Sequence, residues 1–192
     1  KVLADADLAK VKSFSRYMDV DGDGIAARTL PGSAAKGAYF VRGSGHTKHA
    51  AYTEDSDAYQ EVVDRLLRKF ETAKQAVPAP EIRRQEGADI GIVTLGGCHA
   101  AVVEAIDRLR ERGIVADYMR VKAFPFDTPV KGFLDSHGVN FVVEQNRDAQ
   151  LRSLLTIETG FPRDSMIPVL DYSGLPLTAR IVVGAVTKHL EG

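Results

Sequence analysis

The chain has 192 residues, of which 44% are hydrophobic and 27% charged, and its formal net charge is −1. Such a composition is typical of a globular protein with one good core, and near-neutrality disfavours nucleic acids and membrane surfaces as partners because no strong field would attract them. Cys98 is the only cysteine, so the chain alone can form neither a disulfide nor a four-cysteine zinc or iron–sulfur site.

The ends and the apolar runs of the chain bear on its location. No apolar run approaches the roughly 20 residues that a membrane-spanning helix needs, and no basic-then-apolar leader opens the sequence. A reducing cytoplasm fits the single cysteine, which leaves no disulfide to form within the chain. Because the sequence begins with Lys1 rather than Met, we expect it to be a segment of something longer.

Residues 1–17 contain few apolar positions and are interpreted as a short connector. Residues 18–52 are rich in glycine, which predicts loops and turns rather than packed elements. A loop of this length is unusual in a compact domain and is most often functional or wrapped around a partner.

Two motifs in this loop suggest metal binding. The segment DVDGDG copies the first half of a calcium-binding loop, but Leu30 stands where the closing Glu should be, so an exposed Asp/Gly turn is favoured. His46 and His49 could share a metal, but no third ligand accompanies them at a fixed spacing. A surface or interface pair is therefore the preferred interpretation.

A strong amphipathic helix is predicted after Asp55 or Ser56, either of which can cap it. Its apolar residues recur on one face, and the pairs Glu61/Arg65 and Asp64/Arg68 are spaced for i,i+4 ion pairs. The apolar face consists of Tyr59, Val63, Leu66, Leu67 and Phe70. Pro78 and Pro80 end the helix, residues 81–86 are interpreted as a polar linker, and the helix as a docking element for a neighbouring domain.

From Ala88 onward, apolar runs alternate with helical patterns. We predict strands at residues 90–95, 115–121, 141–143 and 166–170, and helices around residues 102–109, 128–134, 151–155 and 181–186, with Thr128 as a cap. This alternation predicts a three-layer α/β fold, with a mainly parallel sheet covered by helices.

Gly96-Gly97 lies between a strand and a helix, where backbone amides could bind a phosphate. The dinucleotide fingerprint needs three glycines, and this segment reads GGCHAA, so a tight structural turn is favoured and a nucleotide site is the weaker alternative. The helix dipole would lower the pKa of Cys98. No base at a suitable spacing accompanies it, so nucleophilic catalysis is not expected.

Polar side chains follow the apolar strand that ends near Val143: Glu144, Asn146, Arg147 and Gln150. They are predicted at the carboxyl end of the sheet, where open α/β sheets bind ligands and partners. Asn146 or Asp148 could cap the next helix, and Glu144 would be costly to bury unless Arg or amide donors met it. A ligand or interface contact and a purely structural network both remain open.

Several blocks of the sequence resemble, in family order, the alpha subunit of 2-oxoacid:ferredoxin oxidoreductases, close to the 2-oxoglutarate type. The blocks are FSRYMDVDGDGIAARTLPG, RGSGHTKHAAYTED, YQEVVDRLLRKFE, IGIVTLGGCHAAVVEAIDRLRERG, AFPF, FVVEQNRDAQLRSLL and LDYSGLPLTAR. The resemblance implies that residues 1–80 form a connector, glycine-rich loop arm and docking helix, and that residues 81–192 form a domain like the transketolase C-terminal domain. The domain that supplies the carboxylate for the thiamine pyrimidine would then lie before Lys1.

The family resemblance also implies where the cofactors are. Thiamine diphosphate, Mg²⁺ and a [4Fe–4S] cluster would be held by the beta subunit, and none by this chain alone. GDG opens the metal–diphosphate motif of thiamine enzymes, but the Asn that should follow some two dozen residues later is missing. The complex would decarboxylate a 2-oxoacid, pass electrons to ferredoxin and deliver the acyl group to coenzyme A.

Within the resemblance, Glu144, Asn146 and Gln150 are expected at an interface or supporting a site, and Arg28 and His46 are expected to contact another domain or subunit. Ala149 departs from the Gly common in the family, and we interpret it as a mild change on a helix. The sequence therefore predicts a supporting segment of an oxidoreductase. The alternative is a non-enzymatic interaction module on the same fold.

Overall fold

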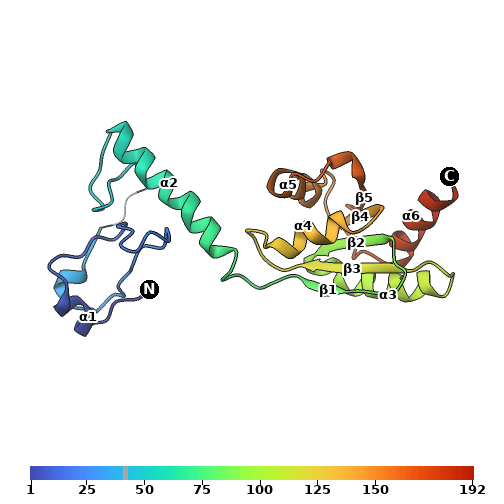
Figure 1. Ribbon diagram of the computed structural model, residues 1–192, viewed down its shortest axis with the longest axis horizontal. Helices are drawn as coiled ribbons and strands as arrows, with labels where there is room; N and C mark the ends of the chain where they lie inside the picture. Colours follow the sequence, from blue (N-terminus) through green and yellow to red (C-terminus); the bar gives the residue numbers. More distant parts are fainter. Residues whose placement is uncertain (41–42) are drawn as a thin grey trace. The chain divides into compact units, whose positions relative to one another are not determined.

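The computed structural model describes residues 1–40 and 43–192; Val41 and Arg42, in the glycine-rich stretch, lie outside the described residues. The chain forms two compact units, Lys1–Ala76 and Val77–Gly192 (Figure 1). None of the helices in the described ranges combines the length and the apolar character needed to cross a bilayer.

The first unit contains little regular structure. Its elements are the short helix α1 (Asp5–Lys10), the 3₁₀ turn η1 (Ala35–Gly37) and the long helix α2 (Ser56–Ala73). Leu8 of α1 is buried, and a Cβ on Gly37 would meet its side chain, so α1 is held by close contact with a glycine of η1. The connector predicted over residues 1–17 therefore includes one helical turn and a half that its polar sequence did not indicate.

Helix α2 begins as predicted, since the Asp55 carboxylate accepts the Ala58 amide at 2.7 Å. The predicted i,i+4 ion pairs are wrong, because the polar face of the helix packs against the loop before it. Glu61 pairs with Lys48 at 3.1 Å, and Arg68 approaches Asp19 at 3.5 Å. Arg65 donates to the Gly24 carbonyl at 2.8 Å.

Most of the apolar face of α2 lies away from that loop, although the Tyr59 ring lies against Gly45. Within this unit Val62 and Arg65 are the buried residues of the helix. The five predicted face residues are all exposed by more than a third: Tyr59, Val63, Leu66, Leu67 and Phe70. The sequence period was therefore correct, but the unit itself packs on the opposite side of the helix.

The second unit is built on a five-stranded sheet in the order β1-β3-β2-β4-β5. The strands are β1 (Glu81–Arg83), β2 (Ile90–Leu95), β3 (Ala116–Val121), β4 (Val139–Glu144) and β5 (Met166–Leu170). Strands β2 to β5 pair in parallel, whereas β1 pairs antiparallel with β3. The polar linker predicted at residues 81–86 is therefore wrong in its first half, because Ile82 pairs with Met119 at the sheet edge.

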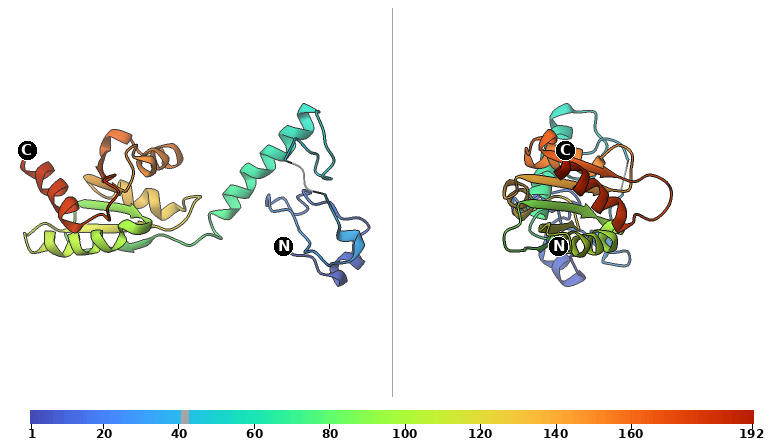
Figure 2. Two further views of the ribbon diagram at one scale, coloured as in Figure 1. Left: turned by 180° about the vertical axis from the view of Figure 1, so that it is seen from behind. Right: turned by 90° about the vertical axis from the view of Figure 1, so that its right-hand side faces the viewer.

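Helices cover both faces of this sheet (Figure 2). The helices are α3 (His99–Arg110), α4 (Thr128–Asp135), α5 (Gln150–Thr159) and α6 (Ala179–Glu191), with 3₁₀ turns η2 (Gly96–Cys98) and η3 (Arg163–Ser165). Helix α4 is capped by Asp127, which accepts the Thr128 amide, and not by Thr128 as predicted. The expected three-layer α/β fold is confirmed.

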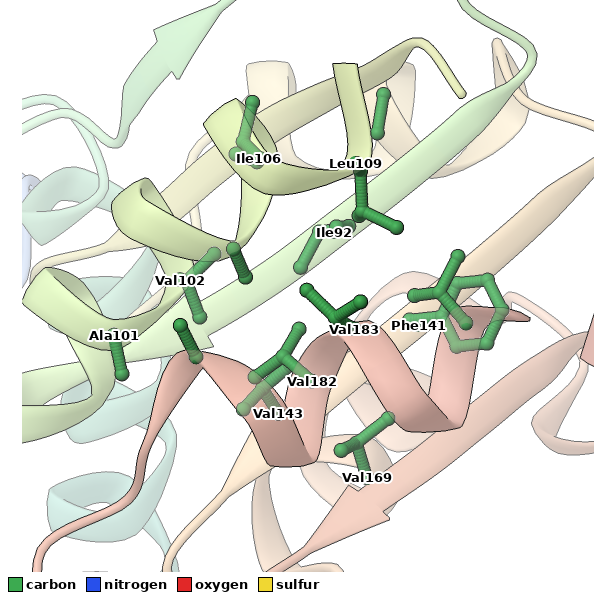
Figure 3. Packing of buried hydrophobic residues seen from close by; sticks show 14 of the residues in the cluster. Ile92, Ala101, Val102, Ile106, Leu109, Phe141, Val143, Val169, Val182 and Val183 are labelled. Atoms are coloured by element: carbon green, nitrogen blue, oxygen red, sulfur yellow. The ribbon is translucent and has the colours of Figure 1, made fainter. Parts of the chain in front are cut away.

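Alternate side chains of each strand feed two separate cores, as expected for a sheet buried on both sides. Ile92 and Phe141 face α3 and α6, where Val102, Leu109 and Val182 pack on them (Figure 3). On the other face, side chains of the strands pack with side chains of α4 and α5 in a second core: Val93, Met119 and Val142 from the strands, and Phe133, Leu134 and Leu155 from the helices. The two cores hold the strands in fixed register. They thereby position the polar side chains at the carboxyl end of the sheet, Glu144, Asn146 and Gln150, which we call the rim.

Candidate functional site at the carboxyl edge of the sheet

A pocket of about 490 Å³ opens in the second unit, where β2, β3 and β4 end. Its lining comes from these strand ends and from the first turn of α5: Leu95, Gly96, Val121, Lys122, Ala123, Phe124, Phe126, Glu144, Asn146, Gln150, Leu151 and Leu154. The carboxyl edge of a parallel sheet is the usual binding place in open α/β folds. Three residues singled out in the sequence, Glu144, Asn146 and Gln150, therefore line one pocket.

Glu144 lies at the back of this pocket and is only 1% exposed. Its carboxylate accepts the backbone amides of Leu151 at 2.6 Å and Arg152 at 3.0 Å, and the side-chain amide of Asn146 at 2.7 Å. A buried carboxylate needs such donors, and the N-terminus of a helix supplies them together with a favourable dipole. Glu144 is thus the anchor that ties β4 to α5.

Asn146 completes the turn between β4 and α5. Its Oδ1 accepts the amides of Asp148 at 3.1 Å and Gln150 at 3.2 Å. Of the two predicted caps, Asn146 therefore accepts free amides, whereas the Asp148 carboxylate accepts from Arg147 at 2.8 Å. The side chain of Arg147 is 74% exposed and is not among the residues lining the pocket.

The sequence position of Ala149 suggests a residue on helix α5, but Ala149 lies immediately before the helix. Its φ is +51°, in the left-handed region that disfavours every residue except glycine. The side chain is nevertheless buried, at 4% exposure. The family resemblance leads one to expect glycine here, and glycine would adopt this backbone conformation without strain. Alanine in place of glycine therefore affects the backbone conformation of the turn, and the interpretation as a mild change on a helix is wrong.

Gly96-Gly97 forms a tight 3₁₀ turn at the mouth of the pocket, with Gly96 at φ +57°. Cys98 is buried behind it, and burial raises the pKa of its thiol, opposite to the expected effect of the helix dipole. His99 Nδ1 lies 2.7 Å from the Tyr118 hydroxyl, and burial raises the pKa of Tyr118 to about 12. Both the thiol and the phenol are therefore protonated at neutral pH.

The remaining predicted residues belong to the first unit. Arg28 is exposed, and its backbone pairs with the chain start, the Leu3 amide donating to its carbonyl at 2.8 Å. His46 stacks on Tyr17 with ring centroids 4.1 Å apart. His49 instead faces Ser15, whose Oγ lies 2.9 Å from its Nδ1, so the two histidines have separate partners.

The DVDGDG segment brings three carboxylates together, with oxygens of Asp19, Asp21 and Asp23 within 4.8 Å of one another. These groups are already engaged: Lys1 Nζ pairs with Asp21 and Asp23 at 2.6 Å, and Asp19 accepts the Gly22 and Gly24 amides. The segment is a hydrogen-bonded acidic turn.

Cofactors of thiamine-dependent oxidoreductases do not fit the residues present here. A Cβ on Gly24 would overlap the backbone of Lys69, so the GDG segment packs on α2 instead of forming an open diphosphate cradle. The single buried cysteine cannot ligate a four-cysteine cluster.

Two pocket residues carried a weaker sequence signal. Lys122 and Phe124 follow the end of β3 and line the wall opposite helix α5. Phe124 is 43% exposed and meets Phe126 edge-on at 5.4 Å. The run AFPF directly after a buried strand could have indicated an apolar wall at the sheet edge.

Comparisons with known proteins agree on one relationship, although no protein-family model matches the chain. The chain is 30% identical over 183 residues to 2-oxoacid:ferredoxin oxidoreductase 2, subunit alpha, of Aeropyrum pernix, which covers 93% of this chain and 28% of that protein. It is 22% identical over 183 residues to a 2-oxoacid:ferredoxin oxidoreductase subunit alpha of Saccharolobus solfataricus, covering 92% and 27%.

A solved structure confirms the fold. The 2-oxoglutarate:ferredoxin oxidoreductase of Magnetococcus marinus, with 2-oxoglutarate, coenzyme A and succinyl-CoA bound, superposes with a TM-score of 0.81 at 24% identity, over 94% of this chain and 31% of that one. The chain spans less than a third of the length of the curated relatives it matches. Over nearly its whole length, this chain is therefore related to one segment of the alpha subunits of 2-oxoacid:ferredoxin oxidoreductases.

Proposed function

We propose that this chain serves as the C-terminal part of the alpha subunit of a thiamine-diphosphate-dependent 2-oxoacid:ferredoxin oxidoreductase. The complex would oxidatively decarboxylate its substrate, transfer the acyl group to coenzyme A and reduce ferredoxin in the cytoplasm. The observation that carries this proposal is the 30% identity to an alpha subunit over 93% of the chain. The preferred substrate is 2-oxoglutarate, because that acid is bound in the Magnetococcus enzyme.

The geometry supports a structural and interface role rather than catalysis by this segment. The hydrogen bonds that the Glu144 carboxylate accepts among the described residues hold α5 and its turn. Cys98 is buried, and its pKa is raised. We therefore assign thiamine diphosphate, Mg²⁺ and the [4Fe–4S] cluster to the beta subunit, and the activating carboxylate to the thiamine-type domain upstream.

The exposed face of α2 supports the interface role. Three turns of helix present large apolar side chains to the exterior of their own unit, including Leu67 at 63% exposure. Scattered apolar residues are normal on surfaces, but a contiguous stripe marks an interaction site. We assign its partner to another part of the same alpha subunit, because the relatives are more than three times as long as the segment matched here.

The assignment of α2 is tested by Leu67→Glu in the assembled enzyme. Recovery of soluble, folded full-length alpha subunit should fall several-fold, because a charge would be buried between α2 and another part of the same subunit. Ile157→Glu is the matched control, since Ile157 is 75% exposed on α5. Equal recovery of both variants and wild type would exclude α2 as the docking element.

A non-enzymatic interaction module on the same fold gives a different result in the same preparation. Such a module would still bind its partner, but removing it from the complex would leave turnover unchanged. The oxidoreductase role requires that turnover be lost when the segment is deleted and restored when it is supplied.

A further inference from the structure

The first unit contains a small cationic pocket that the oxidoreductase role does not use. Its cavity measures about 160 Å³ and lies between α2 and the loop before it. The charged residues lining it are Asp19, Lys48, Glu61, Arg65 and Arg68. All belong to the unit Lys1–Ala76, so the site is independent of the rim at Glu144.

Arg65 is the unusual member of this pocket. It is 7% exposed, and among the described residues its hydrogen bond goes to a neutral acceptor, the Gly24 carbonyl, at 2.8 Å. Its Nε is buried and has no partner in the described part of the chain. A buried guanidinium normally meets a carboxylate or another anion, because an unpaired buried charge is costly.

The two carboxylates that line the pocket do not pair with Arg65 among the described residues, because other donors engage them. Both oxygens of Asp19 accept backbone amides, Oδ1 from Gly22 at 3.1 Å and Oδ2 from Gly24 at 3.0 Å. Glu61 Oε1 accepts from Lys48 Nζ at 3.1 Å. Asp19 also pairs with Arg68 at 3.5 Å, so each carboxylate has one cationic partner and Arg65 is left as the excess positive charge of the pocket.

Further positive charge surrounds the pocket. The Arg16 guanidinium lies 5.0 Å from the centroid of the Tyr17 ring, and that ring also lines the cavity. Burial, together with the nearby charges of Arg16 and Arg68, lowers the pKa of Arg65. Arginine nevertheless stays charged at neutral pH, so the local field favours an anion.

We propose that this pocket binds a single small oxyanion, a phosphate or carboxylate group, held by Arg65, Arg68 and Lys48. The planar fork of arginine suits such groups, and charge-assisted hydrogen bonds to them are stronger than neutral ones. The volume of the cavity admits one phosphate or carboxylate group and excludes a whole nucleotide. A larger ligand would therefore insert only its terminal phosphate or carboxylate group.

The test is a titration of the full chain, labelled with ¹⁵N, with inorganic phosphate at constant ionic strength balanced by sodium chloride. Saturable shifts are expected for the Arg65 side-chain NH and for the amides of Tyr17 and Asp19. A parallel titration with succinate distinguishes the source of the group: tighter binding of phosphate indicates a phosphorylated ligand, and tighter binding of succinate a carboxylate.

Variants connect the shifts to the pocket. Arg65→Gln removes the central charge but can also unfold the unit. The comparison therefore uses Lys48→Gln and Arg68→Gln, because these side chains are 42% and 50% exposed and their replacement should leave the unit folded. Each should raise the dissociation constant about threefold to tenfold. Arg112→Gln, at an exposed position of the second unit, is the matched control and should leave it unchanged.

The proposal is overturned if the shifts rise linearly with phosphate and are reproduced by chloride alone. It is equally overturned if Arg112→Gln weakens binding as much as Lys48→Gln and Arg68→Gln do, because the effect would then be one of net charge and not of this pocket.

Discussion

The carboxylate of Glu144 accepts the backbone amide of Leu151 at 2.6 Å, so the last residue of β4 caps the helix that follows it. Helix α5 lacks a side-chain cap at its own boundary residue, Ala149. A side chain from the strand therefore satisfies amides that would otherwise be orphaned at the helix start. This contact fixes the position of the pocket's back wall.

Replacing Glu144 by Ala should destabilise the second unit by about 2–4 kcal/mol, because two helix amides lose a buried partner. Glu144→Gln should cost less, about 1–2 kcal/mol, since one oxygen remains to accept one amide. Urea unfolding followed by circular dichroism measures both. Glu111→Ala, at an exposed position, is the control and should stay within about 0.5 kcal/mol of wild type; equal stability of all three variants would contradict the capping role.

The left-handed backbone at Ala149 gives a second prediction. Ala149→Gly should change stability by less than about 1 kcal/mol, because relief of the positive φ offsets the lost methyl contacts and the greater freedom of the unfolded chain. Ala149→Val should destabilise by about 2 kcal/mol or more, since a β-branched side chain is strongly disfavoured at φ +51° and the site is buried. Thermal unfolding of the two variants would refute this if Val were tolerated as well as Gly.

The central strands could be predicted from sequence because each is a short apolar run followed by a helical pattern. Strand β1 could not, because Glu81 and Arg83 are polar and its pairing depends on the exposed edge of β3. The packing of α2 was also hidden. Arg65 and Thr72 donate hydrogen bonds to the backbone carbonyls of Gly24 and Asp23 in the preceding loop. Contacts of polar side chains with backbone carbonyls produce no hydrophobic periodicity in the sequence.

The rim could be predicted in position but not in its bonding. A polar sequence after an apolar strand placed Glu144, Asn146 and Gln150 at the carboxyl edge, and the pocket contains all three. The capping hydrogen bond joins Glu144 to Leu151, seven residues later in the chain. It depends on the left-handed backbone of Ala149 in the turn between them, which the sequence does not reveal. The opposite wall, at Lys122 and Phe124, depends on how the loop after β3 folds back.

A buried ionic network at the other end of β3 makes stability depend on pH. The Asp117 carboxylate accepts from Arg84 Nη1 at 2.8 Å and from the Gln85 amide at 2.6 Å, and His137 Nε2 lies 3.0 Å away. Burial acts to raise the pKa of Asp117, but these hydrogen bonds prevail and lower it below its ordinary value of 3.8. The carboxylate is therefore favoured in the folded state.

Because the folded pKa of Asp117 is depressed, its contribution is complete above the unfolded pKa of about 4 and is lost as pH falls through the lower folded value. Asp117→Asn should destabilise the chain by about 1–3 kcal/mol at pH 7 and flatten the fall in stability between pH 5 and pH 3. Urea midpoints across this range measure the effect. Asp64→Asn, at an exposed position, should keep the wild-type slope; a wild-type slope in Asp117→Asn would show that the network does not control acid stability.

Cys98 should react slowly with thiol reagents in the folded chain. It is 3% exposed, and burial raises the pKa of its thiol, so little accessible thiolate is present at pH 8. Labelling with Ellman's reagent should be about a hundredfold or more slower in buffer than in 8 M urea, because it requires local opening. Equal rates in the two conditions would mean that the thiol is accessible and reactive.

The most direct test of the proposed role is the turnover of the assembled enzyme that contains this segment in its alpha subunit. Reduction of ferredoxin should require both coenzyme A and a 2-oxoacid, with 2-oxoglutarate giving the highest kcat/KM in a panel that includes pyruvate, and the isolated chain should show no turnover. An assembled enzyme inert toward every 2-oxoacid tested, or turnover by the isolated chain, would contradict the account.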